Sequence, residues 1–310
     1  MADRIQVVYR DVDRTPLLYV IREMAAEHER LEVVVERVSG AKEYEEGFLR
    51  GEFDLSCEHL RFLFPARLEG HPVRCLAACQ NRSASKLVAA AGVRGVADLP
   101  GKTIAVRATP ATRISTIYWL KRLGLEGRVE TMFVEDDHMG RWQQWRKVVS
   151  GEAHAAVVSP LYLDPAIDAV LHVLDAPPLP EIGPLFFAAL GPFIARHDDA
   201  LRRFMPALYR AVHTFRRDPE ATLAVISGEP ARLMGLKGEP ALRRQYEHLR
   251  ADLDERPVPR LDALATTFAM LSEGYPELPD MNPLTLWDLR YVIELEEQRF
   301  MEGLGDRAGG

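Results

Sequence analysis

The strongest constraint on the fold of this chain is an internal repeat in its first half. Residues 5–56 and 103–156 show the same order of segments: a short apolar strand, a turn, a helix, a second strand, a second helix and a third strand. The equivalent turns contain Thr15-Pro16 and Thr109-Pro110. A duplicated β-α-β-α-β segment predicts two structural units of one kind.

The repeat predicts parallel strands covered by helices, because neighbouring parallel strands need crossover connections. We therefore expect an α/β fold of two lobes with parallel-rich sheets and a ligand cleft between the lobes. The apolar segments 76–88 and 183–195 are the expected crossing strands. They place residues 1–85 and 190–310 in the first lobe and residues 86–189 in the second.

The chain beyond residue 198 is expected to be helical. We predict helices at residues 201–216, 241–252, 261–273 and 284–303. Asn282-Pro283 provides a cap and a first-turn proline for the last of them.

Three segments carry a resemblance to a known fold family. They are GEFDL at residues 51–55, VADLPGKTIAV at 96–106 and NPLTLWD at 282–288. Together with the order of elements they resemble the type II periplasmic-binding-protein fold, in the branch of sulfonate, taurine and thiamine-pyrimidine binding proteins. This resemblance implies a solute receptor of an ABC-type uptake system, with an ABC permease as its partner and a sulfonate, carboxylate or pyrimidine-like solute as its ligand.

A second, shorter resemblance points to an enzyme. DVDRT at residues 11–15 and GEFDLS at 51–56 are similar to 4,5-dihydroxyphthalate decarboxylase, which implies a cytoplasmic lyase of the same fold acting on a small carboxylate. The chain departs from that family at residues 57–59 and 109–113. The cysteine-rich signature of the pyrimidine synthases of the thiamine pathway, which share the fold, is absent.

Composition and charge exclude several partners. A formal net charge of −7 argues against binding a nucleic-acid backbone. The apolar stretches are shorter than the roughly 18 to 20 residues of a membrane span. Residues 1–4 pass directly into the first strand without an apolar signal core, so we expect a cytoplasmic protein; a chain whose leader had been removed would look the same and would be extracytoplasmic.

Cys57, Cys75 and Cys79 show no metal-ligand spacing and are expected to be buried, reduced thiols.

The loop after the strand at residues 103–106 is the main candidate for binding a small anion. The loop opens a helix, whose first backbone amides carry positive partial charge. Arg107 and Arg113 would supply charge-assisted hydrogen bonds, and Thr109 and Thr112 would supply hydroxyls. In the alternative interpretation Thr109 only caps the helix and both arginines face solvent.

The equivalent loop of the first lobe contains Asp13 and Arg14. These residues would orient a hydroxyl or an amine of the ligand, or would form a local ion pair. Four further residues are expected contacts: Asn81 and Arg82 at the first crossing segment, which otherwise form a surface turn, and Ser159 and Tyr162 after the strand that ends at residue 158.

The segment Ser56-Cys57-Glu58-His59 contains a thiol and an acid-base pair. Glu58 and His59 are the candidate catalytic residues, because a carboxylate beside an imidazole can move a proton near neutral pH. Ser56 and Cys57 are candidate ligand contacts. Strand alternation would send Cys57 and Glu58 to opposite sides.

No cofactor is expected. Glu135, Asp137 and His138 are weak candidates for a divalent metal, because adjacent polar residues cannot all converge on one ion.

Two functions remain. The first is a cytoplasmic decarboxylase or other lyase that grips a small carboxylate through the arginines and transfers a proton with His59 or Glu58. The alternative is the uptake receptor. The sequence favours the enzyme and leaves the oligomeric state open.

Overall fold

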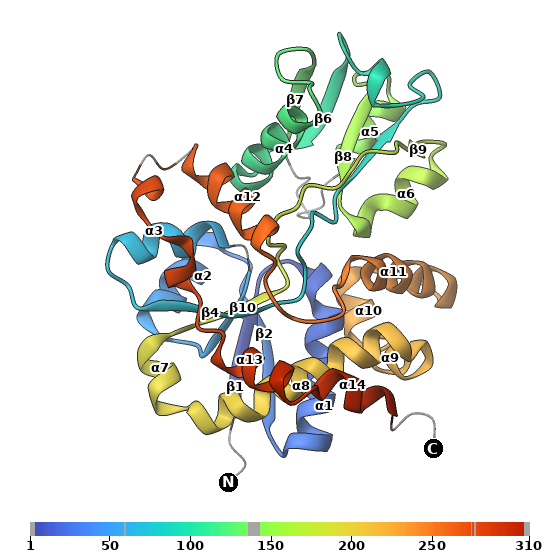
Figure 1. Ribbon diagram of the computed structural model, residues 1–310. Helices are drawn as coiled ribbons and strands as arrows, with labels where there is room; N and C mark the ends of the chain where they lie inside the picture. The colour runs from blue at the N-terminus through green and yellow to red at the C-terminus, as the bar shows by residue number, and fades with distance from the viewer. Residues whose placement is uncertain (1–3, 59, 136–142, 274, 276, 307–310) are drawn as a thin grey trace. The chain divides into compact units, whose positions relative to one another are not determined.

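The computed structural model describes residues 4–58, 60–135, 143–273, 275 and 277–306 (Figure 1). The chain divides into two compact units. Unit 1 comprises residues 1–81, 181–268 and 275–310, and unit 2 comprises residues 82–180 and 269–274.

The sheet of unit 1 has the strand order β2-β1-β3-β10-β4. Its strands are β1 (Arg4–Tyr9), β2 (Glu32–Arg37), β3 (Leu55–Cys57), β4 (Val73–Ala78) and β10 (Phe186–Leu190). β1 pairs in parallel with β2 and β3, whereas β10 runs antiparallel to β3 and β4. The carboxyl ends of β1 and β3 therefore meet at one edge of the sheet.

The sheet of unit 2 has the order β7-β6-β8-β5-β9. Its strands are β5 (Lys86–Ala89), β6 (Thr103–Arg107), β7 (Glu130–Val134), β8 (Ala155–Val158) and β9 (His172–Val173). β6 pairs in parallel with β7 and β8, and β5 runs antiparallel to β8 and β9. The two sheets thus have matching topology, which confirms the internal repeat and the predicted α/β fold class. The sheets are mixed, because β10 and β5 run against their neighbours.

Helices pack on both sheets (Figure 1). In the repeat they are α1 (Thr15–Glu29), α2 (Ala41–Arg50), α3 (Leu63–Leu68), α4 (Pro110–Arg122), α5 (Trp145–Val149) and α6 (Leu163–Asp168). Each helix that follows the first strand of a copy begins with the proline of its Thr-Pro turn within the first two positions, where a missing amide hydrogen is tolerated.

The rest of the chain is helical as expected. The helices are α7 (Gly191–Arg196), α8 (Asp198–Arg217), α9 (Pro219–Ile226), α10 (Glu229–Met234), α11 (Glu239–Asp252), α12 (Leu261–Ser272), α13 (Arg290–Glu297) and α14 (Phe300–Asp306). α8 packs along α1 and closes the main core of unit 1. Within the described ranges, none of the helices combines the length and apolar character that a bilayer crossing requires.

Two sequence predictions of single elements are wrong. The helix expected at residues 284–303 is broken: Trp287 forms a β-bridge with Cys75 of β4, and Arg299, with φ of 50°, separates α13 from α14. The Asn282 cap is confirmed, since its side chain accepts a hydrogen bond from the Leu284 amide at 3.0 Å. The extended segment expected at 183–195 ends early, because Gly191 begins α7.

Asn81 is the last residue of the first segment of unit 1, and it is hydrogen-bonded to the loop that follows α11. Its backbone amide and side-chain amide donate to Asp254 Oδ2 at 2.7 and 3.0 Å, and its Nδ2 also donates to the Val258 carbonyl at 2.9 Å. Its Oδ1 accepts from the Arg260 amide at 2.7 Å. Asn81 is buried, so it does not lie in a surface turn.

We expect Asn81→Ala to lower the free energy of unfolding by about 2–4 kcal/mol, because it removes the three side-chain hydrogen bonds of a buried amide. Urea denaturation of the full chain measures this. The exposed cap variant Asn282→Ala is the control and should lose less than about 1 kcal/mol. Equal losses in the two variants would show that Asn81 does not anchor this loop.

Candidate functional site

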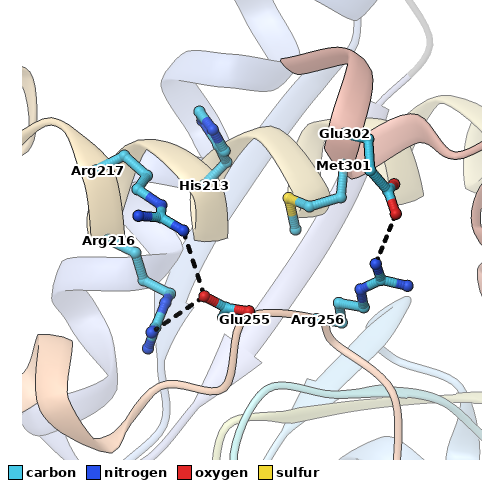
Figure 2. A pocket seen from close by; sticks show the side chains of 7 residues that line it. All are labelled: His213, Arg216, Arg217, Glu255, Arg256, Met301 and Glu302. Carbon is cyan, nitrogen blue, oxygen red and sulfur yellow. Dashed lines mark hydrogen bonds and ion pairs between the residues drawn. The ribbon is translucent and has the colours of Figure 1, made fainter. Parts of the chain in front are cut away.

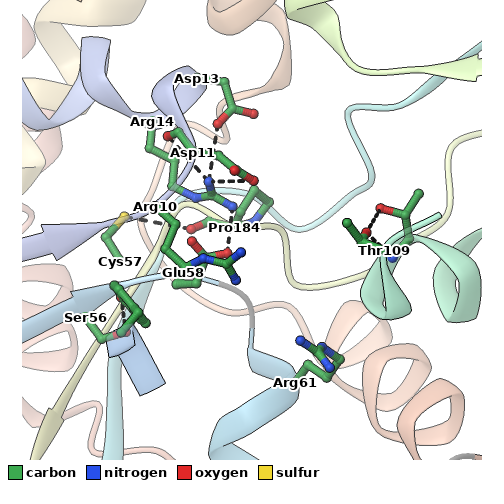
Figure 3. A network of polar contacts seen from close by, with 12 residues as sticks. Arg10, Asp11, Asp13, Arg14, Ser56, Cys57, Glu58, Arg61, Thr109 and Pro184 are labelled. Atoms are coloured by element: carbon green, nitrogen blue, oxygen red, sulfur yellow. Dashed lines mark hydrogen bonds and ion pairs between the residues drawn. The ribbon is translucent and has the colours of Figure 1, made fainter. Parts of the chain in front are cut away.

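The carboxyl edge of the unit 1 sheet gathers charged side chains from two loops (Figure 3). Arg10 and the 3-10 turn Val12–Arg14 follow β1, and Glu58 follows β3. Arg61 lies in the next 3-10 turn, Leu60–Phe62. Because β1 and β3 are parallel neighbours, both loops leave the sheet at the same edge.

Arg14 is the centre of this cluster. Its side chain is 1% exposed, and its Nη2 contacts Glu58 Oε1 at 3.1 Å. Its Nη1 lies 3.3 Å from both Asp13 Oδ1 and Asp11 Oδ2. Burial alone lowers the pKa of Arg14, but the carboxylates of Glu58, Asp13 and Asp11 outweigh it and the net pKa is raised. Arg14 therefore stays charged and joins the two loops.

The proton-transfer roles proposed for this segment gain no support from the geometry. Glu58 is buried and held by Arg14. Burial raises the pKa of Cys57 despite the nearby Arg14, so its fully buried thiol stays protonated; it lies 3.8 Å from the Pro184 carbonyl. The Ser56 hydroxyl is 2.6 Å from that of Tyr44 inside the core. His59 lies outside the described residues.

Two arginines at this edge were missed by the sequence analysis. The Nε atoms of Arg10 and Arg61 are buried, and each has no hydrogen-bond partner among the residues that the structure describes. Arg61 otherwise makes a long contact, 3.7 Å, between its Nη2 and Glu45 Oε1. A buried donor without an acceptor is unfavourable by roughly 1–3 kcal/mol. A bound anion would supply the acceptors.

The carboxyl edge of the unit 2 sheet has the equivalent arrangement. β6 ends at Arg107, which is half-buried, and α4 begins two residues after Ala108. The Thr109 hydroxyl accepts from the Thr112 amide at 3.3 Å and donates to the Thr112 hydroxyl at 2.8 Å. Thr109 thus caps the helix, as the alternative interpretation expected. The capped end still carries the positive pole of the helix dipole.

The other predicted contacts of unit 2 lie at or near this edge. Arg113 is exposed, and its guanidinium lies over the Phe133 ring, 3.9 Å from the ring centroid. Ser159 and Tyr162 follow β8, the parallel neighbour of β6, and both are half-buried. Arg82, also half-buried, is the first residue of unit 2.

The structure therefore brings the predicted residues together in two groups, one in each unit. Asp13, Arg14 and Glu58 share the edge of unit 1, and the loop at 107–113 shares the edge of unit 2 with Ser159 and Tyr162. Their roles as ligand contacts stay predictions.

The structure gives no support to a metal site at the three weak candidates. Glu135 is exposed, and Asp137 and His138 lie outside the described residues. Across the part of the chain that the structure describes, no group of three or more acidic, histidine or cysteine side chains could hold a metal ion. The three cysteines are free and buried, as predicted.

Comparison with known proteins identifies relatives. A family model described as NMT1/THI5 like matches residues 27–222, which is more than half of the chain. A search of curated proteins finds no match.

Solved structures share the fold over almost the whole chain. The periplasmic sulfonate-binding protein SsuA of Methylobacillus flagellatus KT is 14% identical, with a TM-score of 0.70 over 97% of this chain and 96% of its own. The periplasmic aliphatic sulphonate binding protein SsuA of Escherichia coli is 16% identical, with a TM-score of 0.67 over 89% and 88%. A cysteine-to-serine mutant of DSZB, in complex with biphenyl-2-sulfinic acid, is 14% identical, with a TM-score of 0.66 over 96% and 100%. The predicted resemblance to this fold family is confirmed.

We expect Arg14→Met to lower the free energy of unfolding by about 3–5 kcal/mol, because it leaves buried Glu58 without its counter-ion. The double variant Arg14→Met/Glu58→Met removes both buried charges and should recover part of this loss. Chemical denaturation of the native chain, the two single variants Arg14→Met and Glu58→Met, and the double variant measures the coupling. Additive losses from the two substitutions would contradict a buried ion pair between these residues.

Proposed function

Because the chain belongs to the NMT1/THI5-like family, we propose that it is a binding protein for a small organic sulfur oxyanion, of the sulfonate type, in an ABC-type uptake system. Chain-long similarity to two sulfonate-binding proteins supports this proposal. The DSZB structure supports the same ligand class, since it holds a sulfinic acid on the same fold.

The observation that carries the proposal is the pair of buried Nε donors on Arg10 and Arg61. A sulfonate spreads one negative charge over three oxygens and so accepts several hydrogen bonds at once. Guanidinium groups suit such a group because their donors are charged and fixed in one plane. We propose that Arg10 and Arg61 hold the sulfonate group of the ligand at the edge of the unit 1 sheet.

Binding without chemical change is the function that these contacts support. Catalysis by a decarboxylase would need a proton donor at this edge, and Glu58 is held by the buried guanidinium of Arg14. The burial of Cys57 keeps a thiolate nucleophile from forming. Neither the family nor the neighbours support the decarboxylase that the sequence favoured, so the receptor is the function we propose.

The proposed role also revises the expected location. A receptor meets its solute outside the membrane, and the two SsuA neighbours are periplasmic proteins. We therefore propose an extracytoplasmic location, in place of the cytoplasmic one expected from the sequence, with an ABC permease as partner. The proposal requires no cofactor.

Isothermal titration of the full chain with a series of alkanesulfonates tests the proposal. We expect saturable binding, and we expect Arg10→Ala and Arg61→Ala each to weaken it about tenfold or more, the effect of losing a charge-assisted hydrogen bond. Arg94→Ala, at an exposed position of unit 2, is the matched control and should bind normally.

Mass spectrometry of the same mixtures separates binding from catalysis. The sulfonates should be recovered unchanged, and a parallel panel of aromatic carboxylates should show no loss of CO2. Recovery of a decarboxylated product would restore the lyase interpretation, and normal binding by both arginine variants would remove the proposed site.

A further inference from the structure

Gln80 is a buried amide at the same edge of the unit 1 sheet as the candidate site. β10 runs antiparallel to both β3 and β4, so β3 and β4 are parallel to each other and end at one edge. β4 ends at Ala78, two residues before Gln80. Gln80 therefore lies on the edge that also carries the loops of Arg10 and Arg61.

The segment that leads into β10 connects Gln80 to the end of β3. The Gly183 amide donates to the Gln80 carbonyl at 3.0 Å, and the Pro184 carbonyl lies 3.8 Å from the Cys57 thiol (Figure 3). β10 lies between β3 and β4, so the ends of these two strands are about 10 Å apart. One small ligand and the side chains that hold it can span this distance.

The side-chain oxygen of Gln80 is buried without a donor beside it. The residue is 4% exposed, and its Oε1 has no hydrogen-bond partner among the residues that the structure describes. Its neighbour Asn81 is buried as well, yet both polar atoms of that side chain are hydrogen-bonded to the loop after α11. Two adjacent buried amides thus differ, because only that of Asn81 is satisfied within the described chain.

Charged side chains elsewhere in unit 1 pair with one another. A cavity of about 450 Å³ lies among α8, α14 and the loop after α11 (Figure 2). Arg216 and Arg217 of α8 both pair with Glu255 there, and Arg256 pairs with Glu302. The guanidinium groups of this cavity therefore have their counter-ions within the chain and differ from the amide at the sheet edge.

Gly183 keeps the Gln80 side chain in one place. A Cβ atom at position 183 would lie 2.7 Å from Gln80 Cβ and 2.9 Å from its Oε1, which is closer than such atoms approach. The close packing of the two segments therefore requires glycine here. The Ile182 amide donates to the buried Thr267 hydroxyl at 2.8 Å, which anchors the same segment. The position of the Gln80 oxygen is thereby fixed by its surroundings.

We propose that Gln80 selects a hydroxyalkanesulfonate: its Oε1 accepts a hydrogen bond from the hydroxyl group of a ligand whose sulfonate group is held by Arg10 and Arg61. This inference rests on the proposed sulfonate-binding function and specifies its ligand. The amide is uncharged, so it suits a neutral donor rather than an ammonium group. A ligand with a methyl group in place of the hydroxyl would leave the buried acceptor without a donor and would bind more weakly.

Isothermal titration of the full chain with matched ligand pairs tests this selection. The pairs are 2-hydroxyethanesulfonate with propane-1-sulfonate, and 3-hydroxypropane-1-sulfonate with butane-1-sulfonate. We expect the hydroxyl member of at least one pair to bind at least tenfold more tightly than its methyl partner. Equal or weaker binding of both hydroxyl members would overturn the proposal. Tighter binding of 3-aminopropane-1-sulfonate than of either hydroxyl member would also overturn it, because charge would then select the ligand.

Variants at Gln80 and Gly183 locate the selection. Gln80→Met removes the amide at nearly constant size, so it should abolish the hydroxyl preference and leave the binding of the methyl member nearly unchanged. Gly183→Ala displaces the Gln80 side chain and should reduce the preference in the same way. Gln298→Met, at an exposed position at the end of α13, is the control and should keep the preference. A full preference in Gln80→Met would contradict the proposal.

Urea denaturation distinguishes a ligand contact from a structural amide. Because Gln80 Oε1 lacks a partner among the described residues, Gln80→Met should unfold at no lower urea concentration than the native chain. A loss of stability comparable with that of Asn81→Ala would show that the amide stabilises the fold, and would contradict its role in selection.

A final arm separates this inference from the proposed function. Binding of butane-1-sulfonate that weakens in Arg61→Ala would support the sulfonate site whether or not a hydroxyl is preferred. Equal binding of both ligand pairs would then overturn the role of Gln80 alone. If none of the sulfonates binds the native chain, the proposed function fails, and the inference that rests on it fails too.

Discussion

The candidate site depends on the buried ion pair between Arg14 and Glu58. Arg14 follows β1 in the sequence, whereas Glu58 follows β3. A buried charge of this kind is tolerated only when its counter-ions and hydrogen bonds hold it in a fixed geometry. Arg14 thereby joins the two loops at the edge of the unit 1 sheet, and Arg10 and Arg61 lie in or next to these loops.

The same plan is used twice in the chain. In each copy of the repeat the first strand (β1 or β6) lies between the second and the third, and the next strand of the sheet (β10 or β5) runs antiparallel. Each copy therefore brings the loops after its first and third strands to one edge. In unit 1 those loops carry an ion network, and in unit 2 they carry a capped helix start with Arg107 beside it. Duplication explains why a single topology yields two edges with donors for an anion.

Much of this architecture could be predicted from the sequence. The order of apolar and helical segments revealed the repeat, and the Thr-Pro turns marked where α1 and α4 begin. Local chemistry also predicted the Asn282 cap, and the Thr109 cap was the alternative interpretation of its loop. The pairing of Asp13 with Arg14 could be expected, since the two residues are adjacent.

Features that depend on distant contacts could not be predicted. Trp287 pairs with β4 and so interrupts a segment whose pattern is helical throughout. Glu58 reaches Arg14 across 44 positions of sequence. Arg10 and Arg61 look like ordinary charged loop residues, and only the packing around their Nε atoms distinguishes them. Asn81 is a polar break in an apolar run of the sequence, and its partners lie more than 170 positions away.

The most direct test of the central claim is a crystal structure of the full chain with a bound alkanesulfonate. The account predicts sulfonate oxygens at hydrogen-bond distance, about 3 Å, from the Nε atoms of Arg10 and Arg61. A sulfonate bound elsewhere, with both Nε atoms still lacking an acceptor, would contradict it.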